Sequence, residues 1–192
     1  MLILVRHGQT APNAEGLLLG RADPPLTDLG RRQAEALARA LGSPDRVVSS
    51  PLQRARATAA AFGLPVEVDE RWIELDYGDL DGTAPSDVGG EVWDRWRTDP
   101  HFVPAGGESL AALGDRVRRA CKDLADEAST ADVVVVTHVS PIKAAVAWAL
   151  GTGDEVAWRL YVYDASVCRI LTGPPGPRLV AFNEVHPPAG EG

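Results

Sequence analysis

The chain has 192 residues, of which 45% are hydrophobic and 24% are charged, and its formal net charge at pH 7 is −8. This length and composition suit one globular domain and exclude a disordered, collagen-like or coiled-coil chain. The acidic balance argues against binding to nucleic acid or to an anionic membrane, so any anion must be met by a local basic pocket.

Cysteine usage and the N-terminus predict a cytoplasmic protein. Cys121 and Cys168 are too few for a disulfide framework and lack the spacing of metal ligands. No apolar run approaches the ~20 residues of a membrane span. Arg6 and His7 come too early for a secretory signal. We therefore expect a reducing cytosol as the location and no membrane partner.

The first predicted strand is the apolar run at residues 2–5, and His7 stands just after its end. Such a run is typical of a central strand that is buried on both faces. The next element is an amphipathic helix, which either Thr27 or Asp28 caps. Gly42 then ends this helix, because glycine readily adopts the backbone conformation of a C-terminal cap.

The second strand is predicted at residues 46–49, and a helix follows it. We expect Ser50 to cap that helix and Pro51 to occupy its first position, because proline is favoured there. Residues 65–68 are then predicted to form a third short strand.

An acidic loop around Glu74 and a stretch without long periodicity follow the third strand. Residues 83–106 contain Trp93 and Trp96 between prolines and glycines, which predicts a small cap or a short helix. We expect the two tryptophans to pack within this cap, where one of them lines the mouth of a pocket. Apolar residues at helical spacing after Ser109 then predict a long amphipathic helix.

The C-terminal third begins with the valine-rich run at residues 133–137, which predicts a second central strand and leads directly to His138. A Ser-Pro pair then opens a helix. Residues 166–171 and 178–182 are predicted to be strands joined by a Gly-Pro turn, and residues 187–192 to form a loose tail. Strands and helices alternate almost throughout, so we predict an α/β fold with a largely parallel sheet.

Four polar residues are expected to meet at the carboxyl ends of these strands, where α/β folds bind ligands. His7 and His138 each follow a predicted central strand, while Arg54 lies in the helix after the second strand and Glu74 in the loop after the third. Any one of them alone is more often structural than functional. Together they predict one pocket.

The motifs that carry chemistry occur in one order along residues 2 to 186. They are Leu4-Val5-Arg6-His7-Gly8-Gln9-Thr10 with Asn13, Ser49-Ser50-Pro51-Leu52-Gln53-Arg54-Ala55, Glu74, Asp81-Gly82, Gly106-Gly107-Glu108-Ser109 and Val136-Thr137-His138. This set resembles the histidine phosphatase superfamily, also called phosphoglycerate mutase-like. The runs around Arg54 and His138 look most like those of α-ribazole phosphatases and of the acid phosphatase half of bifunctional ribonuclease H/acid phosphatases.

The resemblance implies a three-layer α/β/α sandwich around a mostly parallel sheet. It implies a single histidine phosphatase domain over residues 1–192, with a short cap at about residues 83–106 and the loose tail at residues 187–192. Because Met1 directly precedes the first strand, we expect no ribonuclease domain before it.

The resemblance also implies the catalytic roles. His7 attacks phosphorus and forms a phosphohistidine, while Glu74 protonates the leaving alcohol and then activates water. Arg6, Arg54 and His138 hold the phosphoryl oxygens. These residue types suit the chemistry, because arginine meets phosphate oxygens bidentately and two nearby guanidinium groups lower the pKa of His7.

Four further residues are predicted to bind substrate: Gln9, Asn13, Arg21 and Val139. The side chains of Gln9 and Asn13 can add neutral hydrogen-bond donors to the phosphate site, and Arg21 is a further substrate contact. The family often has Glu where this chain has Gln9 and Gly where it has Val139. These two departures bear on substrate preference rather than on the nucleophile.

The expected activity is hydrolysis of a small phosphorylated metabolite without metal or other cofactor. A cationic pocket already supplies the positive charge that a metal would provide, and the spacing of three nearby carboxylates is not that of metal ligands: Asp76, Asp79 and Asp81.

One alternative function is that of a 2,3-bisphosphoglycerate-dependent phosphoglycerate mutase. It is disfavoured because only 24 positions separate Gly82 from Gly106, where mutases carry a longer segment. The other is a silent phospho-ligand binding domain, which would not need Glu74. The substrate, and whether the chain is a monomer or a homodimer, stay open.

Overall fold

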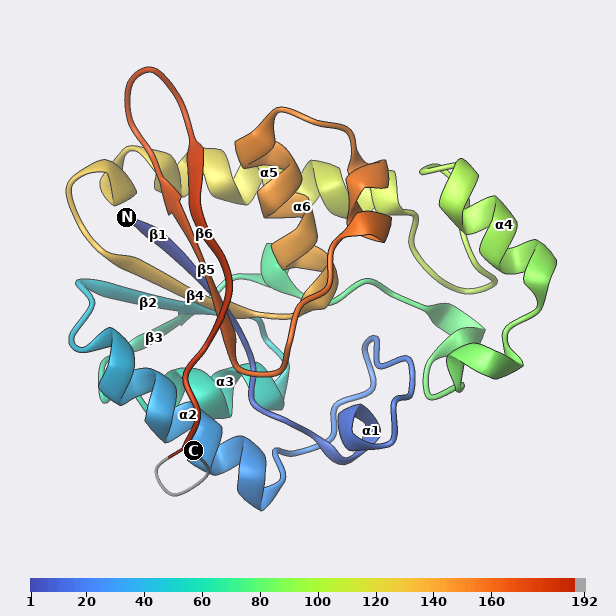
Figure 1. Cartoon of the computed structure of the whole chain (residues 1–192), viewed down its shortest axis with the longest axis horizontal. Helices are drawn as coiled ribbons and strands as arrows, with labels where there is room; N and C mark the ends of the chain where they lie inside the picture. The colour runs from blue at the N-terminus through green and yellow to red at the C-terminus, as the bar shows by residue number, and fades with distance from the viewer. Residues whose placement is uncertain (189–192) are drawn as a thin grey trace.

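A six-stranded sheet lies between two helical layers in the computed structural model, which describes residues 1–188 (Figure 1). The strands are β1 (Leu2–Arg6), β2 (Arg46–Ser49), β3 (Val66–Val68), β4 (Val133–Thr137), β5 (Ser166–Leu171) and β6 (Arg178–Val185). Their order is β3-β2-β4-β1-β5-β6, and β5 is the strand that runs antiparallel to both of its neighbours. The predicted three-layer sandwich with a mostly parallel sheet is confirmed.

The helices follow the predicted amphipathic patterns, with one short addition after β1. The α-helices are α1 (Ala11–Ala14), α2 (Asp28–Leu41), α3 (Gln53–Ala60), α4 (Gly90–Thr98), α5 (Leu110–Ala125) and α6 (Val139–Leu150). Short 3-10 helices are η1 (Glu70–Trp72), η2 (Gly78–Leu80), η3 (Pro85–Asp87), η4 (Glu127–Ser129) and η5 (Asp154–Arg159). The unpredicted α1 forms because Thr10 and Asn13 cap it reciprocally.

Side-chain alternation along the central strands builds the two halves of the core. Leu2 and Leu4 of β1 pack on the face that α5 and α6 cover. Ile3 and Val5 point to the opposite face, where they meet Leu37 of α2 and the alanines of α3. The valines of β4 divide between the two faces in the same way. Both faces of the central strands are buried under helices, which explains why these strands consist almost wholly of apolar residues.

Two predicted helix starts are wrong by one or two positions. Helix α3 begins at Gln53 rather than at Pro51, and its first N–H is capped by Asp23 Oδ1 at 2.8 Å. Ser50 Oγ accepts the N–H of Leu52 at 3.3 Å and also lies 2.6 Å from His138 Nε2. Helix α6 begins at Val139, directly after His138, and not at the Ser-Pro pair. In both helices a carboxylate from a distant segment accepts an N–H of the first turn, Asp23 in α3 and Glu74 in α6.

Of the two predicted caps of α2, Thr27 is the one observed, since its hydroxyl accepts the N–H of Gly30. Ser109 caps α5 in the same way by accepting the N–H of Ala112. Strand β6 continues to Val185, beyond the predicted end at residue 182. The predicted tail at residues 187–192 lies outside the described residues from residue 189 onward. None of the helices within residues 1–188 has the length and apolar character that crossing a lipid bilayer requires.

Residues 83–106 form η3 and α4, which lie apart from the two helical layers at one end of the molecule (Figure 1). Trp96 of α4 is buried, and its ring stacks on Trp93 with centroids 5.6 Å apart. Trp158 of η5 meets both rings edge-on. An aromatic cluster therefore joins α4 to the rest of the fold, as predicted for the two cap tryptophans.

The loop after β1 is held against the start of α2 by a direct contact of backbones. A Cβ atom on Gly30 would lie 2.1 Å from the carbonyl oxygen of Gln9, and one on Gly8 would lie 2.3 Å from that of Gly30. Only glycine fits at either position, and this approach sets the path of the chain directly after His7.

Gly30→Ala is expected to lower the free energy of unfolding by about 1–3 kcal/mol, because the added methyl group meets rigid backbone. Gly90→Ala, at an open helical position of α4 with no atom within 4 Å, should instead raise it by about 0.4–1 kcal/mol. Urea unfolding of the two variants measures the difference. Equal stability of the two variants would contradict the contact described here.

Candidate active site

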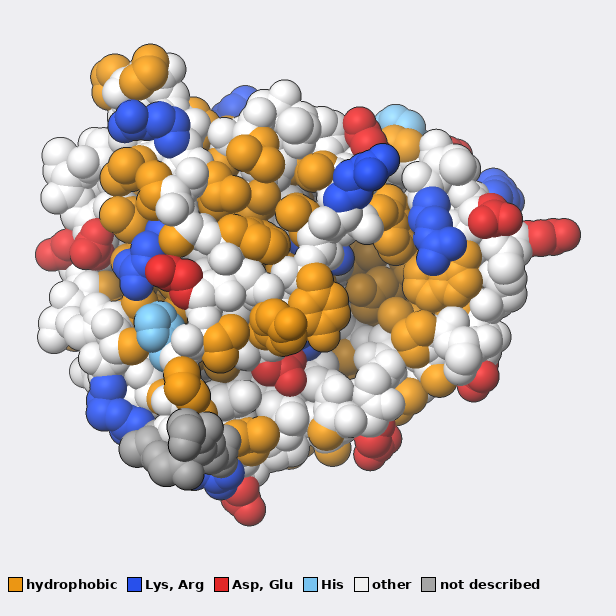
Figure 2. All heavy atoms as spheres, in the orientation of Figure 1, with side chains coloured by type: hydrophobic (Ala, Val, Ile, Leu, Met, Phe, Trp, Pro, Cys, Tyr) orange, Lys and Arg blue, Asp and Glu red, His pale blue; other side chains and the backbone are white. Residues whose placement is uncertain are grey.

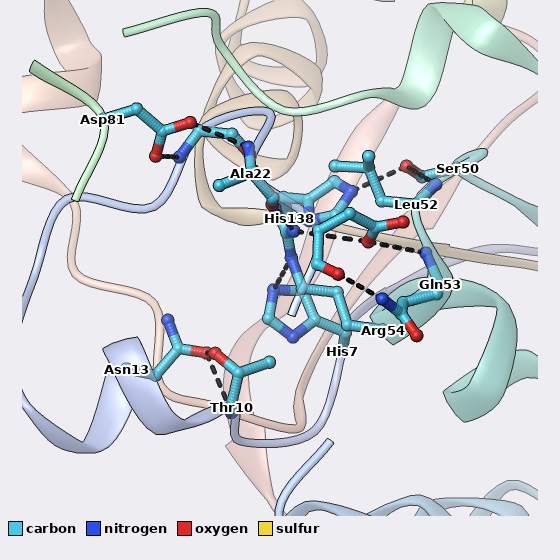
Figure 3. Close-up of polar contacts among 12 residues, drawn as sticks. His7, Thr10, Asn13, Ala22, Ser50, Leu52, Gln53, Arg54, Asp81 and His138 are labelled. Carbon is cyan, nitrogen blue, oxygen red and sulfur yellow. Dashed lines mark hydrogen bonds and ion pairs between the residues drawn. The ribbon is translucent and has the colours of Figure 1, made fainter. Parts of the chain in front are cut away.

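His7 lies at the carboxyl end of β1 and is only 2% exposed. Its backbone N–H continues the ladder to β4 by donating to Thr137 O at 3.0 Å. The ring atom Nδ1 lies 2.7 Å from the carbonyl oxygen of Gly8, which can only accept, so Nδ1 carries the proton. Arg54 Nε donates to Nε2 of the same ring at 3.2 Å (Figure 3). Nε2 therefore holds a lone pair.

Both histidines of the site are neutral. Burial lowers the pKa of His7 well below its ordinary value, and the charges of Arg54 and Arg6 lower it further. The pKa of His138 is lowered mainly by burial, and its proximity to His7 and to the nearby arginines lowers it further, since a proton on His138 would be repelled there. The two rings meet edge-on with centroids 5.0 Å apart. The predicted effect of the guanidinium groups on His7 is confirmed, although burial is the larger cause.

Arg54 comes from the first turn of α3 and is fully buried. Besides His7, its guanidinium donates to the carbonyl oxygens of Ala22 at 2.6 Å and Gly20 at 2.7 Å. The carboxylate of Asp81 holds the N–H groups of the same two residues, at 2.8 Å for Gly20 and 2.7 Å for Ala22 (Figure 3). The loop around Arg21 is thus fixed from both sides.

Arg6 is oriented from the segment before β5. Its Nη1 donates to Val162 O at 2.7 Å, and its Nη2 pairs with Asp164 at 2.6 Å. Two buried nitrogens of the site, Arg6 Nε and His138 Nδ1, have no hydrogen-bond partner among the described residues. Buried polar atoms are normally satisfied, so these two nitrogens have unused hydrogen-bonding capacity within the described structure.

Glu74 lies after η1 and is 3% exposed. Its Oε1 accepts the N–H of Leu75 at 2.7 Å and that of Ser140, in the first turn of α6, at 3.1 Å. The bond to Ser140 places the carboxylate at the first turn of α6, whose N-cap is His138. The charge of Glu74 acts on Arg54, as the charges of Arg54 and Arg6 act on His7. The structure therefore brings together all five residues predicted to be catalytic, while their catalytic roles stay predictions.

Arg116 of α5 supports the Glu74 segment and was missed by the sequence analysis. Its Nη1 donates to Arg71 O at 2.6 Å and Ile73 O at 2.7 Å, and its Nη2 donates to Glu74 O at 3.2 Å. Glu108 accepts from the same guanidinium at 2.9 and 3.0 Å. No local pattern marks Arg116 as a support of Glu74, because the three carbonyl oxygens that it holds lie more than 40 positions earlier in the chain.

Two of the predicted substrate-binding residues have structural partners. Asn13 Oδ1 accepts from the N–H of Thr10 at 3.1 Å and from its hydroxyl at 2.7 Å, and Figure 3 shows the amide nitrogen directed away from Thr10. Gln9 Oε1 accepts from Thr27 Oγ1 at 3.1 Å. In each case the carbonyl oxygen of the side chain is engaged, and their role as donors to a ligand stays a prediction.

The other two substrate-binding candidates lie on the open side of the site. Arg21 is 43% exposed and forms ion pairs with Asp76 at 3.2 Å and Glu108 at 3.5 Å. Val139 follows His138 and lines a cavity of about 190 Å³ between α6 and α4. Within the described part of the chain, no three His, Cys, Asp or Glu side chains are grouped as metal ligands would be.

A sequence profile of the histidine phosphatase superfamily (branch 1) matches residues 2–185. A bifunctional protein of Mycobacterium tuberculosis is 39% identical over 176 residues, which cover 86% of this chain and 48% of that protein. The chain thus spans about half the length of the first curated relatives it matches. An adenosylcobalamin/α-ribazole phosphatase of Escherichia coli is 32% identical over 171 residues, covering 84% of each chain.

Among solved structures, phosphoserine phosphatase from Entamoeba histolytica in complex with 3-phosphoglyceric acid superimposes with a TM-score of 0.89. The two sequences are 26% identical, and the match covers 96% of both chains. The family resemblance predicted from the motifs is confirmed.

The two neutral histidines make stability depend on pH. Below pH 6.5 the unfolded chain binds a proton on each of them that the native chain does not bind, so the free energy of unfolding falls as pH falls. Each histidine contributes a slope of up to about 1.4 kcal/mol per pH unit. His138→Gln should remove one such slope between pH 6.5 and pH 5, whereas His101→Gln, at an exposed position, should not. Urea unfolding at several pH values measures both, and identical slopes would refute the assignment.

Arg116→Met is expected to lower the free energy of unfolding by about 1–3 kcal/mol, because it leaves three carbonyl oxygens without their donor and Glu108 with Arg21 alone. The amide of Leu75 should then exchange faster with solvent, since the Glu74 segment loses its support. Arg119→Met, at an exposed position of the same helix, should change stability by no more than about 0.5 kcal/mol. Unchanged exchange at Leu75 in Arg116→Met would show that Arg116 does not hold this segment.

Proposed function

The chain belongs to the histidine phosphatase superfamily, branch 1, and we propose that it hydrolyses phosphomonoesters without metal, through a phosphohistidine on His7. Phosphatase relatives support the reaction class. The observation that carries the proposal is the pair of hydrogen bonds on the His7 ring. Together they leave Nε2 unprotonated and direct it toward the Arg54 guanidinium.

The surroundings of His7 suit a phosphoryl group. Phosphoryl transfer depends mainly on positioning and on neutralising the equatorial oxygens. Arg54 has five N–H groups, of which three hold protein acceptors in this structure, so two are left for phosphate. Arg6 Nε and His138 Nδ1 supply the two further polar atoms that lack partners. An anionic group at this point would satisfy them.

Glu74 supplies the proton in the proposed reaction. As Nε2 of His7 forms its bond to phosphorus, the bond from phosphorus to the ester oxygen breaks, and the leaving oxygen takes the proton of Glu74. A water molecule then gives its proton to the Glu74 carboxylate and attacks phosphorus. The bond from nitrogen to phosphorus breaks, which releases phosphate and restores neutral His7.

The remaining features are consistent with a small phosphorylated metabolite as substrate. We propose that residues 83–106 act as a cap, since α4 lines the cavity that Val139 borders. Gln9, Asn13 and Arg21 are proposed to contact the substrate. Two buried free thiols, of Cys121 and Cys168, suit a reducing compartment, and we propose a cytoplasmic enzyme that is a monomer or a homodimer.

Steady-state hydrolysis of p-nitrophenyl phosphate, measured across pH with EDTA present, tests the proposal. His7→Ala should abolish turnover, by about 10³-fold or more, because it removes the nucleophile. Glu74→Gln should lower turnover by about 10²–10⁴-fold and let the acid-labile phosphohistidine accumulate, since water is no longer activated. Arg56→Ala, at an exposed position two residues after Arg54, is the matched control and should retain activity.

Turnover that survives in His7→Ala would refute the phosphohistidine route. Turnover that appears only when a metal ion is added would refute the metal-independent reaction. A phospho-ligand that binds but is not hydrolysed would favour the silent binding domain, and transfer between phosphoglycerates would favour the mutase.

A further inference from the structure

The cavity of about 190 Å³ beside Glu74 has no role in the phosphate chemistry itself. Its walls come from α4, η5, the start of α6 and the loop after Glu74, and Figure 2 shows the surface hollowed over hydrophobic side chains between α4 and the rest of the molecule. The rings of Trp93, Trp96, Trp158 and Tyr77 are among the walls. Such a lining favours an apolar, ring-shaped ligand over a strongly hydrated one.

This cavity adjoins Glu74 through two of its wall residues. Leu75, the residue after Glu74, is part of its wall, and so is Ser140, whose N–H holds the Glu74 carboxylate at 3.1 Å. If Glu74 protonates the leaving oxygen, the alcohol attached to that oxygen extends into the cavity. The shape and polarity of the cavity therefore indicate which alcohol the site accepts, and they do not bear on the phosphate group.

One charged side chain, that of Lys143, lies among the apolar residues of the cavity wall. Lys143 lies one turn after Val139 in α6, is half-buried, and has no hydrogen-bond or ion-pair partner among the described residues. Burial lowers the pKa of its ammonium group, while the negative charge of Glu74 acts in the opposite direction. The Glu74 carboxylate is already held by two N–H groups, so it is not a dedicated partner. Because Lys143 is only half-buried, its ammonium group keeps contact with water, and an anion bound in the cavity can pair with it.

We propose that the alcohol released by this enzyme combines an apolar ring, packed among the tryptophans of the cavity, with a carboxylate or similar anionic group that pairs with Lys143. The inference rests on the proposed function, because Glu74 must act on the leaving oxygen. A small polyhydroxylated alcohol would leave the aromatic walls uncovered and would lose hydration without compensation. Lys143 is thereby a specificity residue, outside the phosphate site.

Four phosphate esters test the proposal in kcat/KM measurements: glycerol 3-phosphate, benzyl phosphate, and the 3-carboxybenzyl and 4-carboxybenzyl phosphates. The three benzyl alcohols are similar leaving groups, so their differences report on binding in the cavity. Benzyl phosphate should exceed glycerol 3-phosphate by about ten-fold or more through burial of the ring. At least one carboxylate should add about another ten-fold through the pairing with Lys143.

Lys143→Met should remove the gain from the carboxylate and keep the preference for benzyl phosphate over glycerol 3-phosphate, since methionine preserves the apolar stem. Lys122→Met is the matched control, because Lys122 is the other lysine of the chain and is exposed on α5. Calorimetric binding of the carboxybenzyl phosphates to His7→Ala, with and without Lys143→Met, measures the same pairing without turnover.

The outcomes separate the inference from the function on which it rests. Turnover that depends on His7 but is equal for the benzyl and glycerol esters overturns the inference and leaves the proposed function standing. A carboxylate gain that survives in Lys143→Met also overturns it. If no ester is hydrolysed, the proposed function fails, and the calorimetry then supports or overturns the pairing at Lys143 by itself.

Discussion

The contact between the Arg54 guanidinium and Nε2 of His7 is the interaction on which the site depends. It requires a neutral imidazole, and burial supplies this condition by lowering the pKa of His7. The same guanidinium holds the carbonyl oxygens of Gly20 and Ala22, so the His7 ring and the loop around Arg21 share one support. A buried arginine that is held by two backbone carbonyl oxygens is a rigid electrostatic element, prepared before a ligand arrives.

The sheet places the other groups around this contact. Strands β1 and β4 are parallel neighbours, with Arg6 paired to Thr137, so the two residues that follow, His7 and His138, end side by side. Strand β2 pairs with β4 on the other side and ends next to Ser50, which meets His138. Parallel pairing thus brings three separate segments of the chain to one edge, the general reason that α/β folds bind ligands there.

The proposed acid is held by a separate set of contacts. Arg116 and the N–H groups of Leu75 and Ser140 position Glu74, while the His7 ring contacts Arg54 and Gly8. Leu75 and Ser140 also line the aromatic cavity that Lys143 borders. The proposed acid and the proposed choice of alcohol therefore share two supporting residues, whereas the contacts of the His7 ring are separate.

The sequence by itself determined the α/β class, the central strands, the amphipathic helices and the five residues of the proposed catalytic set. Apolar runs and helical spacing are local, and the motifs around His7, Arg54 and His138 are contiguous. Tertiary structure alone decided the start of α3, which depends on Asp23, and the partner of Ser50, which is His138. It also decided the supports of Glu74 and the aromatic surroundings of Lys143. These features depend on contacts between residues that are distant in the chain, and only the packing of the sheet and helices brings such residues together.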